Sequence, residues 1–449
     1  MGQTSSPARP LAPLFWRIAG GYLPALLLIV AAGSGAWLWL QQDGAPPLAT
    51  VAADHAQLRD ADIAFFETRV VETRDSLSYN RLTARYLQRL RETGDVADLG
   101  RAERSALRSL EVAKGAYSGL VYLASVRIAQ HRFVEAAEVS RQAIGVDAKE
   151  PAAMAVLGDA LMALGQYDAA AASYQMLLES APGPEAFVRQ ASLAELRGDI
   201  EVARQFWEAA IDADAAQAPE NAAWARVQLG NLLFTTGDLS GARDAFATAL
   251  QVFPEYPSAQ AGLGRVAAAS GKYSDAIDWL EKATARIPAP EYVILLGDVL
   301  ARSGDGGGAA RQFALVDVIG RLLEENGVKD DLTLIIFRTD HGGVAPTLVE
   351  AAAAAYERRP SVAAADAYAW TLYRAGRLTE ARAFAERALA QGTRDPALFF
   401  HAGVIAHALG DNASALRWLK AAHELNPQFS VLHAAELERR IDELGGGGK

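Results

Sequence analysis

The stretch from Asp331 to Gly343, DLTLIIFRTDHGG, combines an apolar run with two side chains that can bind metal ions. Asp340 and His341 follow the apolar run directly. A carboxylate oxygen and an imidazole nitrogen together suit a zinc or a calcium site. These two residues are therefore the first candidates for chemistry in the chain.

The same stretch resembles the strand and the Asp-His metal ligands of the sulfatase and alkaline phosphatase families. That resemblance implies a metal-dependent hydrolase, with a nucleophile in a Cys/Ser-x-Pro-x-Arg sequence and further carboxylate ligands on separate strands. The flanking sequence supplies neither and has helical periodicity instead. We therefore expect residues 332–340 to form a helix, Gly343 to lie in a turn and Pro360 to end the next helix. A hydrolase using Asp340 and His341 remains a minor alternative.

Other patterns typical of cofactor or metal sites are missing from the sequence. No two histidines have the i, i+4 spacing that places two ligands on one face of a helix. The glycine run 306–308 is not followed by the Lys-Ser/Thr of a phosphate-binding loop. We expect no cofactor, no metal and no catalytic residues. The seven histidines are His55, His131, His341, His401, His407, His423 and His433.

Composition excludes several functional classes. The chain has 449 residues, 51% of them hydrophobic, and a formal net charge of −11. An acidic chain lacks the basic surface that non-specific nucleic-acid binding requires. The absence of cysteine excludes disulfides, thiol catalysis, cysteine-based zinc sites and a lipoprotein anchor.

An internal repeat dominates the sequence, and the segment from Pro151 to Pro184 represents it best. Small residues, Gly158 and Ala170, stand where two helices must approach closely. Gly165 permits the turn between those helices. Units begin near Asn80, Tyr117, Pro151, Pro184, Ala223, Pro257, Pro290, Lys329, Val362 and Pro396. Their turns fall at Gly94, His131, Gly165, Gly198, Gly237, Gly271, Gly304, Gly343, Gly376 and Gly410.

The order and spacing of these residues resemble the tetratricopeptide repeat (TPR), a helix–turn–helix unit of about 34 residues. The resemblance covers roughly residues 80–427 and is closest to bacterial, membrane-anchored TPR proteins. It implies an all-α fold, an α-solenoid in which about ten units form a right-handed superhelix. It also implies a scaffold without enzymatic activity, which binds a protein or an extended peptide in its concave groove.

The N-terminal region contains an apolar segment, residues 18–40, that is long enough to cross a bilayer. Arg9 and Arg17 precede it, and Asp43 and Asp54 follow. By the positive-inside rule, the N-terminus is cytoplasmic and the repeats are extracytoplasmic, on a single-pass protein of the bacterial cytoplasmic membrane. A cleaved signal peptide is the alternative.

These observations divide the chain into six parts. They are a cytoplasmic tail (1–17), a transmembrane anchor (18–40), a linker with an initial helix (41–79), a first TPR block (80–304), a second TPR block (305–428), and a capping helix with a flexible tail (429–449). We expect a longer loop around residues 214–221. We also expect a long second helix reaching Glu325, and a hinge at Gly304–Gly308, where three consecutive glycines reduce packing.

The groove is expected to be lined by the first helix of each unit, and its two ends differ. The N-terminal end is basic and the C-terminal end is aromatic. The candidate binding residues are Arg81, Arg85, Gln88 and Arg91 at the first end and Trp370, Tyr373, Arg374, Phe400, His401 and His407 at the second. Between them lie Asp159, Arg189, Glu195, Gln228, Asn231, Phe234, Arg265 and Asp298. Aromatic residues and arginine dominate binding energy at interfaces. Trp370 and Phe400 could alternatively belong to the core between units.

Three functions remain open at this stage. The first is a membrane-tethered scaffold for a protein or peptide in envelope assembly or secretion. The second is a glycan-binding repeat protein of exopolysaccharide or cell-envelope export, because an exposed aromatic strip suits sugar stacking. The third is the hydrolase considered above. The partner, the pathway and the oligomeric state are not determined by the sequence.

Overall fold

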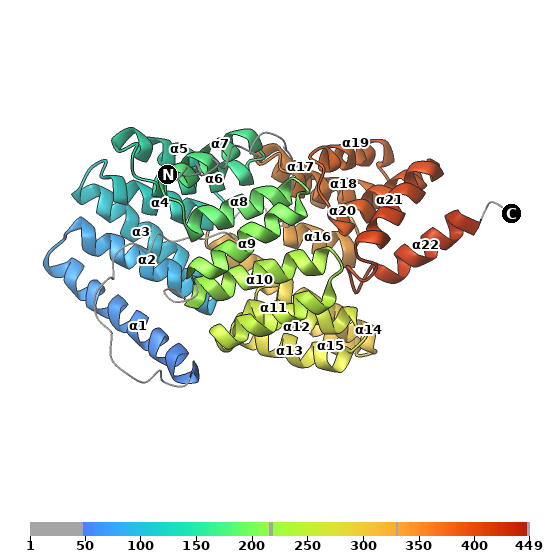
Figure 1. Cartoon of the computed structure of the whole chain (residues 1–449), viewed down its shortest axis with the longest axis horizontal. Helices are drawn as coiled ribbons and strands as arrows, with labels where there is room; N and C mark the ends of the chain where they lie inside the picture. Colours follow the sequence, from blue (N-terminus) through green and yellow to red (C-terminus); the bar gives the residue numbers. More distant parts are fainter. Residues whose placement is uncertain (1–47, 215–218, 329–330, 447–449) are drawn as a thin grey trace, which may run out of the picture.

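The computed structural model describes residues 48–214, 219–328 and 331–446, which form helices and their connections without strands (Figure 1). Ten helix pairs, called units 1–10, follow one another. Their first helices are α2 (Ser76–Thr93), α4 (Tyr117–Ala129), α6 (Ala152–Ala163), α8 (Pro184–Leu196), α10 (Pro219–Thr235), α12 (Pro257–Ala269), α14 (Pro290–Ser303), α16 (Leu332–His341), α18 (Val362–Arg374) and α20 (Pro396–Ala408). Their second helices are α3 (Ala97–Val112), α5 (Phe133–Val146), α7 (Tyr167–Ser180), α9 (Ile200–Asp214), α11 (Leu239–Val252), α13 (Tyr273–Arg286), α15 (Gly306–Glu325), α17 (Pro346–Arg358), α19 (Leu378–Leu389) and α21 (Asn412–Leu425). Helix α1 (Leu48–Glu72) precedes the pairs and α22 (Ala434–Gly446) follows them.

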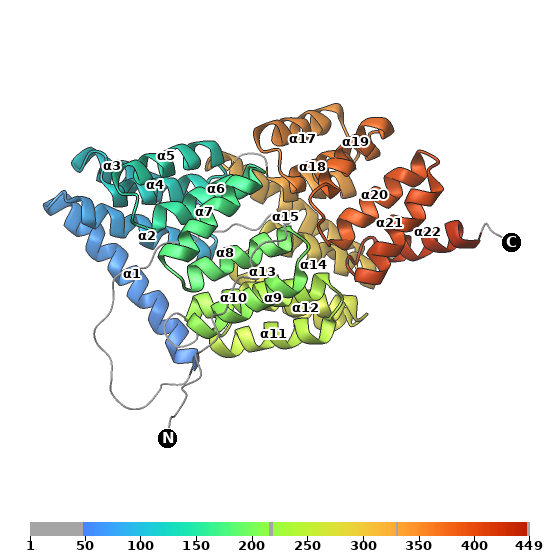
Figure 2. The ribbon, with the colours of Figure 1, turned by 45° about the horizontal axis from the view of Figure 1, so that its top comes forward.

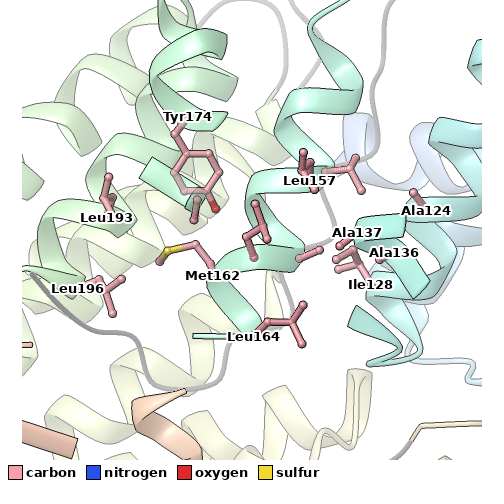
Figure 3. Packing of buried hydrophobic residues seen from close by; sticks show 14 of the residues in the cluster. Ala124, Ile128, Ala136, Ala137, Leu157, Met162, Leu164, Tyr174, Leu193 and Leu196 are labelled. Atoms are coloured by element: carbon pink, nitrogen blue, oxygen red, sulfur yellow. The ribbon is translucent and has the colours of Figure 1, made fainter. Parts of the chain in front are cut away.

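Within each unit, the two helices meet where the sequence has small residues. A Cβ atom on Gly158 would lie 2.3 Å from the ring of Tyr174, so only glycine allows α6 and α7 to pack this closely. Figure 3 shows Tyr174 in the resulting cluster with Leu157, Met162 and Leu193. The expected all-α repeat solenoid is therefore confirmed.

The turns between paired helices also follow the prediction, except in unit 8. Gly165 has a φ of 71°, a left-handed value that favours glycine, and His131 adopts 56° at the equivalent position. In unit 8, α16 ends at His341 and Gly343 is not left-handed. The connection to α17 is instead extended.

Units five apart along the chain lie against each other. A Cβ atom on Gly165, in the turn of unit 3, would lie 2.4 Å from the carbonyl oxygen of Pro360, which follows the second helix of unit 8. The same relationship joins Gly94 to Ile287, Gly198 to Gly392 and Gly237 to Leu425. Figures 1 and 2 both show α17 beside α7. The array therefore completes one superhelical turn in five units, and units 6–10 stack on units 1–5.

Two expectations about insertions had different outcomes. The loop expected around residues 214–221 is wrong in extent, because α9 continues to Asp214 and α10 already begins at Pro219. The inserted residues lengthen two helices instead. The long helix α15 does reach Glu325, as expected. Gly306 starts this helix, and Asp305 caps it by accepting a hydrogen bond from the Gly308 amide. The hinge at this point stays a prediction.

The membrane anchor expected at residues 18–40 lies outside the described residues. Among the helices that are described, none combines the length and the apolar character needed to cross a membrane.

Candidate partner-binding surfaces

Polar side chains in the middle of the expected groove are buried and bonded to each other. Arg189 of α8 donates two hydrogen bonds to Asp159 of α6, at 2.9 and 2.8 Å, and the Tyr174 hydroxyl donates a third at 2.9 Å. Arg189 is only 1% exposed. These side chains therefore fill a position where an open groove was expected.

Glu195, another of the middle residues, lies against the second helix of its own unit. The indole N–H of Trp207 donates a hydrogen bond to its carboxyl group. Burial raises the pKa of Glu195 to about 8, although this hydrogen bond acts in the opposite direction. At neutral pH the carboxyl group is therefore largely protonated. Its hydrogen-bond partner is Trp207 inside the fold.

Asn231 of α10 is also engaged within the chain. Arg265 Nη2 donates a 2.6 Å hydrogen bond to Asn231 Oδ1, and the guanidinium lies 4.2 Å from the centre of the Phe234 ring. Burial lowers the pKa of Arg265 to about 10. The predicted middle of the groove is thus a packed polar interior between units 5 and 6.

The arginines expected at the N-terminal end of the groove are more accessible. Arg85 is 37% exposed and forms an ion pair with Asp62 of α1, with a shortest distance of 2.6 Å. Arg91 approaches Glu220 of α10 at 3.6 Å, across the join between units 1 and 5. Arg81 is half-buried, and it has no ion-pair partner among the described residues.

Arg81 and Arg85 also act electrostatically on Tyr122 of α4. Burial raises the pKa of Tyr122, and the two arginines partly offset that rise. The three side chains therefore form one local surface on α2 and α4, which we call the basic strip.

The aromatic strip expected at the C-terminal end is wrong for its three central residues. Trp370, Phe400 and His401 are 2%, 0% and 5% exposed. Trp370 stacks on Tyr373 with ring centres 5.0 Å apart, and on His401 at 4.2 Å. These residues therefore form the core between units 9 and 10, the alternative left open by the sequence. Of the other candidates, Tyr373 and His407 are half-buried and Arg374 is exposed.

Helix α22 covers this end of the array, as the predicted capping helix should. Leu437 is fully buried in the cluster with Trp370 and Phe400. Arg440 forms a 3.1 Å hydrogen bond with Nδ1 of His407. A partner reaching His407 from this side would therefore compete with α22.

The buried His401 has an acidic partner that was not among the candidate residues. His401 Nδ1 lies 2.9 Å from a carboxylate oxygen of Asp366. Burial alone would lower the pKa of His401, but the Asp366 carboxylate outweighs this effect and raises it. Asp366 lies in α18 and His401 in α20, 35 residues apart, so only the fold shows that they are neighbours. Their sequence spacing gives no signal.

Asp340 and His341 do not face a common centre. The Trp370 indole donates a 2.7 Å hydrogen bond to Asp340, and His433 Nε2 lies 3.6 Å from the same carboxylate. His341 Nε2 instead approaches Asp298 at 3.1 Å. In the part of the chain that the structure describes, no group of three or more such side chains could hold a metal ion.

A stacked array of helix–turn–helix units is the class of protein that this geometry defines. Two family models, both described as tetratricopeptide repeat, match residues 127–191 and residues 227–291 and 369–428. The chain therefore contains tetratricopeptide repeats, the repeat type of protein-interaction scaffolds. No curated protein matches its sequence.

Several solved structures are similar over part of the chain. The type IV pilus biogenesis factor PilW is 18% identical, with a TM-score of 0.39 and coverage of 45% of this chain and 92% of PilW. A TPR protein from Parabacteroides merdae is 18% identical, with a TM-score of 0.40 and coverage of 54% and 97%. YrrB, a TPR protein with an unusual peptide-binding site, is 18% identical, with a TM-score of 0.29 and coverage of 42% and 96%.

Proposed function

We propose that this chain is a membrane-tethered scaffold that holds a protein or extended peptide partner in bacterial envelope assembly or secretion. The observation that carries the proposal is the array of ten TPR units, because stacked repeats create extended binding surfaces. Recognition would rest on complementary surfaces and would involve no bond chemistry.

The basic strip of Arg81, Arg85 and Tyr122 is the binding surface that we favour. Arginine and tyrosine are the residue types that contribute most at interfaces. Arg81 has no ion-pair partner among the described residues, so an acidic partner segment would provide a missing counter-charge. The preferred partner is therefore a protein or peptide with an acidic stretch.

Membrane tethering through residues 18–40 is the second part of the proposal. Tethering raises the effective concentration of the scaffold for partners in the same membrane. Replacing Leu27 and Val30 with arginine should release the full chain from the membrane fraction into the soluble fraction. Retention of this double variant in the membrane would contradict an anchor formed by residues 18–40.

The burial of the aromatic residues argues against the alternative of a glycan-binding protein. It required an exposed aromatic strip, but Trp370 and Phe400 are buried in the core. Alanine substitutions at these two positions would test folding rather than glycan binding.

The basic strip can be tested by affinity capture from envelope extract with the detergent-solubilised full chain. The test variant carries Arg81→Glu and Arg85→Glu. The control carries Arg243→Glu and Arg286→Glu, which change the charge equally at two exposed sites. A protein retained by the parent and the control but lost by the test variant would be identified and its binding repeated with purified components. Equal retention by all three chains would contradict the assigned surface.

A further inference from the structure

The turns between paired helices form one surface on units 1–5 and an equivalent surface on units 6–10. Units 6–10 cover the first of these surfaces, whereas most of the second is open. In units 3, 4 and 5, a Cβ atom on the turn glycine would lie 2.4–2.5 Å from a main-chain oxygen of units 8, 9 and 10, respectively. In units 7–10, no atom of the described residues lies within 4 Å of such a Cβ atom. These open turns are at Gly304, Gly343, Gly376 and Gly410.

The complementary surface is also present twice. At the ends of the second helices of units 8–10, Ser361, Thr393 and Asn426 are buried. At the equivalent ends of units 1 and 2, Lys114 and the segment 147–150 are exposed. One face of the molecule thus carries open turns, and the opposite face carries open helix ends.

We propose that a second copy of this chain stacks on the first, head to tail, with its helix ends from units 1–3 on the open turns of units 7–10. The occupant follows from continuity: the chain already joins the same two surfaces between units 1–5 and units 6–10. A heterologous contact of this kind leaves one free surface of each type, so it propagates into a closed ring or an open filament.

The charges on the two faces are compatible with this stacking. The turn face carries Arg302 and Arg377 beside Asp305, while the end face carries Asp147 and Lys149. Each face therefore contains both positive and negative side chains. Stacking does not bring together two surfaces of the same charge.

On the turn face, helix α22 and the segment before it lie against units 6 and 7. There they line a pocket of about 120 Å³ with Ala268, Tyr273 and Arg302. At Gly376 and Gly410, no described atom lies within 4 Å of an added Cβ atom.

Two glycines allow each face to be blocked without disturbing the monomer. Gly183 lies at the end of unit 3 with an extended φ of 172° that any residue can adopt. Gly306 begins α15 next to the open turn of unit 7, and neither glycine has a neighbouring atom within 4 Å of an added Cβ among the described residues. Gly183→Glu blocks the end face, and Gly306→Glu blocks the turn face. Met176→Glu, on an exposed position of α7, is the matched control.

The test is sedimentation velocity of the full chain in a mild detergent over a series of concentrations, after circular dichroism has verified folding. The parent and the Met176→Glu control should form species that grow with concentration. Each glycine variant alone should be monomeric, because every copy then lacks one of the two faces that the contact needs. An equimolar mixture of the two should form dimers and nothing larger, because one variant keeps a free turn face and the other keeps a free end face.

Three outcomes would overturn the proposal. A parent chain that stays monomeric up to its solubility limit has no such contact. Association that persists unchanged in both glycine variants uses another surface. A mixture that fails to form dimers, although each variant is folded, excludes the head-to-tail arrangement.

Discussion

The side-chain amide of Asn426 donates a 2.6 Å hydrogen bond to the main-chain carbonyl of Phe234, which lies 192 residues earlier in the chain. In a solenoid, most contacts join neighbouring repeats. This bond instead joins the end of unit 10 to the turn region of unit 5. It is one of a series of contacts between units five apart, and the series makes the array a stack of two superhelical turns.

Replacing Asn426 with alanine should destabilise the fold by about 1 kcal/mol, because the Phe234 carbonyl loses this donor and keeps only the bond from the Gly237 amide. Asn426 is 1% exposed, so water cannot easily take its place. Urea denaturation measures the effect. Asn412→Ala, at an exposed position, should change stability by less than about 0.5 kcal/mol. Equal effects of the two substitutions would show that the bond between superhelical turns contributes nothing.

The buried pair of Asp159 and Arg189 predicts a strong asymmetry between single and double substitutions. Asp159→Leu leaves the buried Arg189 guanidinium with only Glu185, at 4.0 Å, as a counter-charge, which should cost about 3–5 kcal/mol. Adding Arg189→Met removes the buried charge and should restore most of the loss. The exposed pair Arg243–Asp244 is the control, and Asp244→Leu there should cost at most about 1 kcal/mol. A double variant as unstable as Asp159→Leu would contradict this account.

Glu195 predicts that folding stability decreases as the pH rises. Its pKa is about 8 in the folded protein, against an ordinary value of 4.5, so between these values the folded state binds more protons than the unfolded state. This contribution is complete below pH 4.5 and is lost as the pH rises through 8. Glu195→Gln keeps an acceptor for the Trp207 indole but cannot ionise. In urea denaturation at pH 5 and pH 8.5, the variant should lose less stability than the parent between the two conditions; identical losses would refute the assignment.

The Asp366 carboxylate should hold His401 in its protonated form. Since the pKa of His401 is raised, its contribution to stability is present below pH 6.5 and is lost as the pH rises through the folded-state value. Asp366→Asn should lower this pKa, measured from the NMR shift of the His401 ring during a pH titration. The parent protein, titrated under the same conditions, is the reference. An unaltered His401 titration would remove Asp366 as the cause.

The units could be predicted from the sequence because their determinants are local. Gly158 faces Tyr174 within one unit, and Gly165 forms the turn between the same two helices. Asp340 was correctly assigned to the end of a helix, which the structure extends by one residue to His341, because the repeat spacing outweighed the apparent metal motif.

The closure of the superhelix could not be predicted in the same way. The turn at Gly165 rests on the carbonyl oxygen of Pro360, and a contact with main-chain atoms leaves no pattern in the side chains. The expected groove therefore became a packed interior, as Arg189 shows. At the C-terminal end, Trp370 and Phe400 were open to two interpretations, because helical periodicity alone does not distinguish a covered face from an exposed one.

The distance between the turn of unit 3 and the end of unit 8 tests the central claim most directly. The chain contains no cysteine, so Gln166→Cys and Pro360→Cys, both at exposed positions, would provide the two sites for spin labels. Double electron–electron resonance should give a single short and narrow distance distribution, although 194 residues separate the two sites. A long or broad distribution would show that units 3 and 8 do not stack, and would contradict a superhelix that closes every five units.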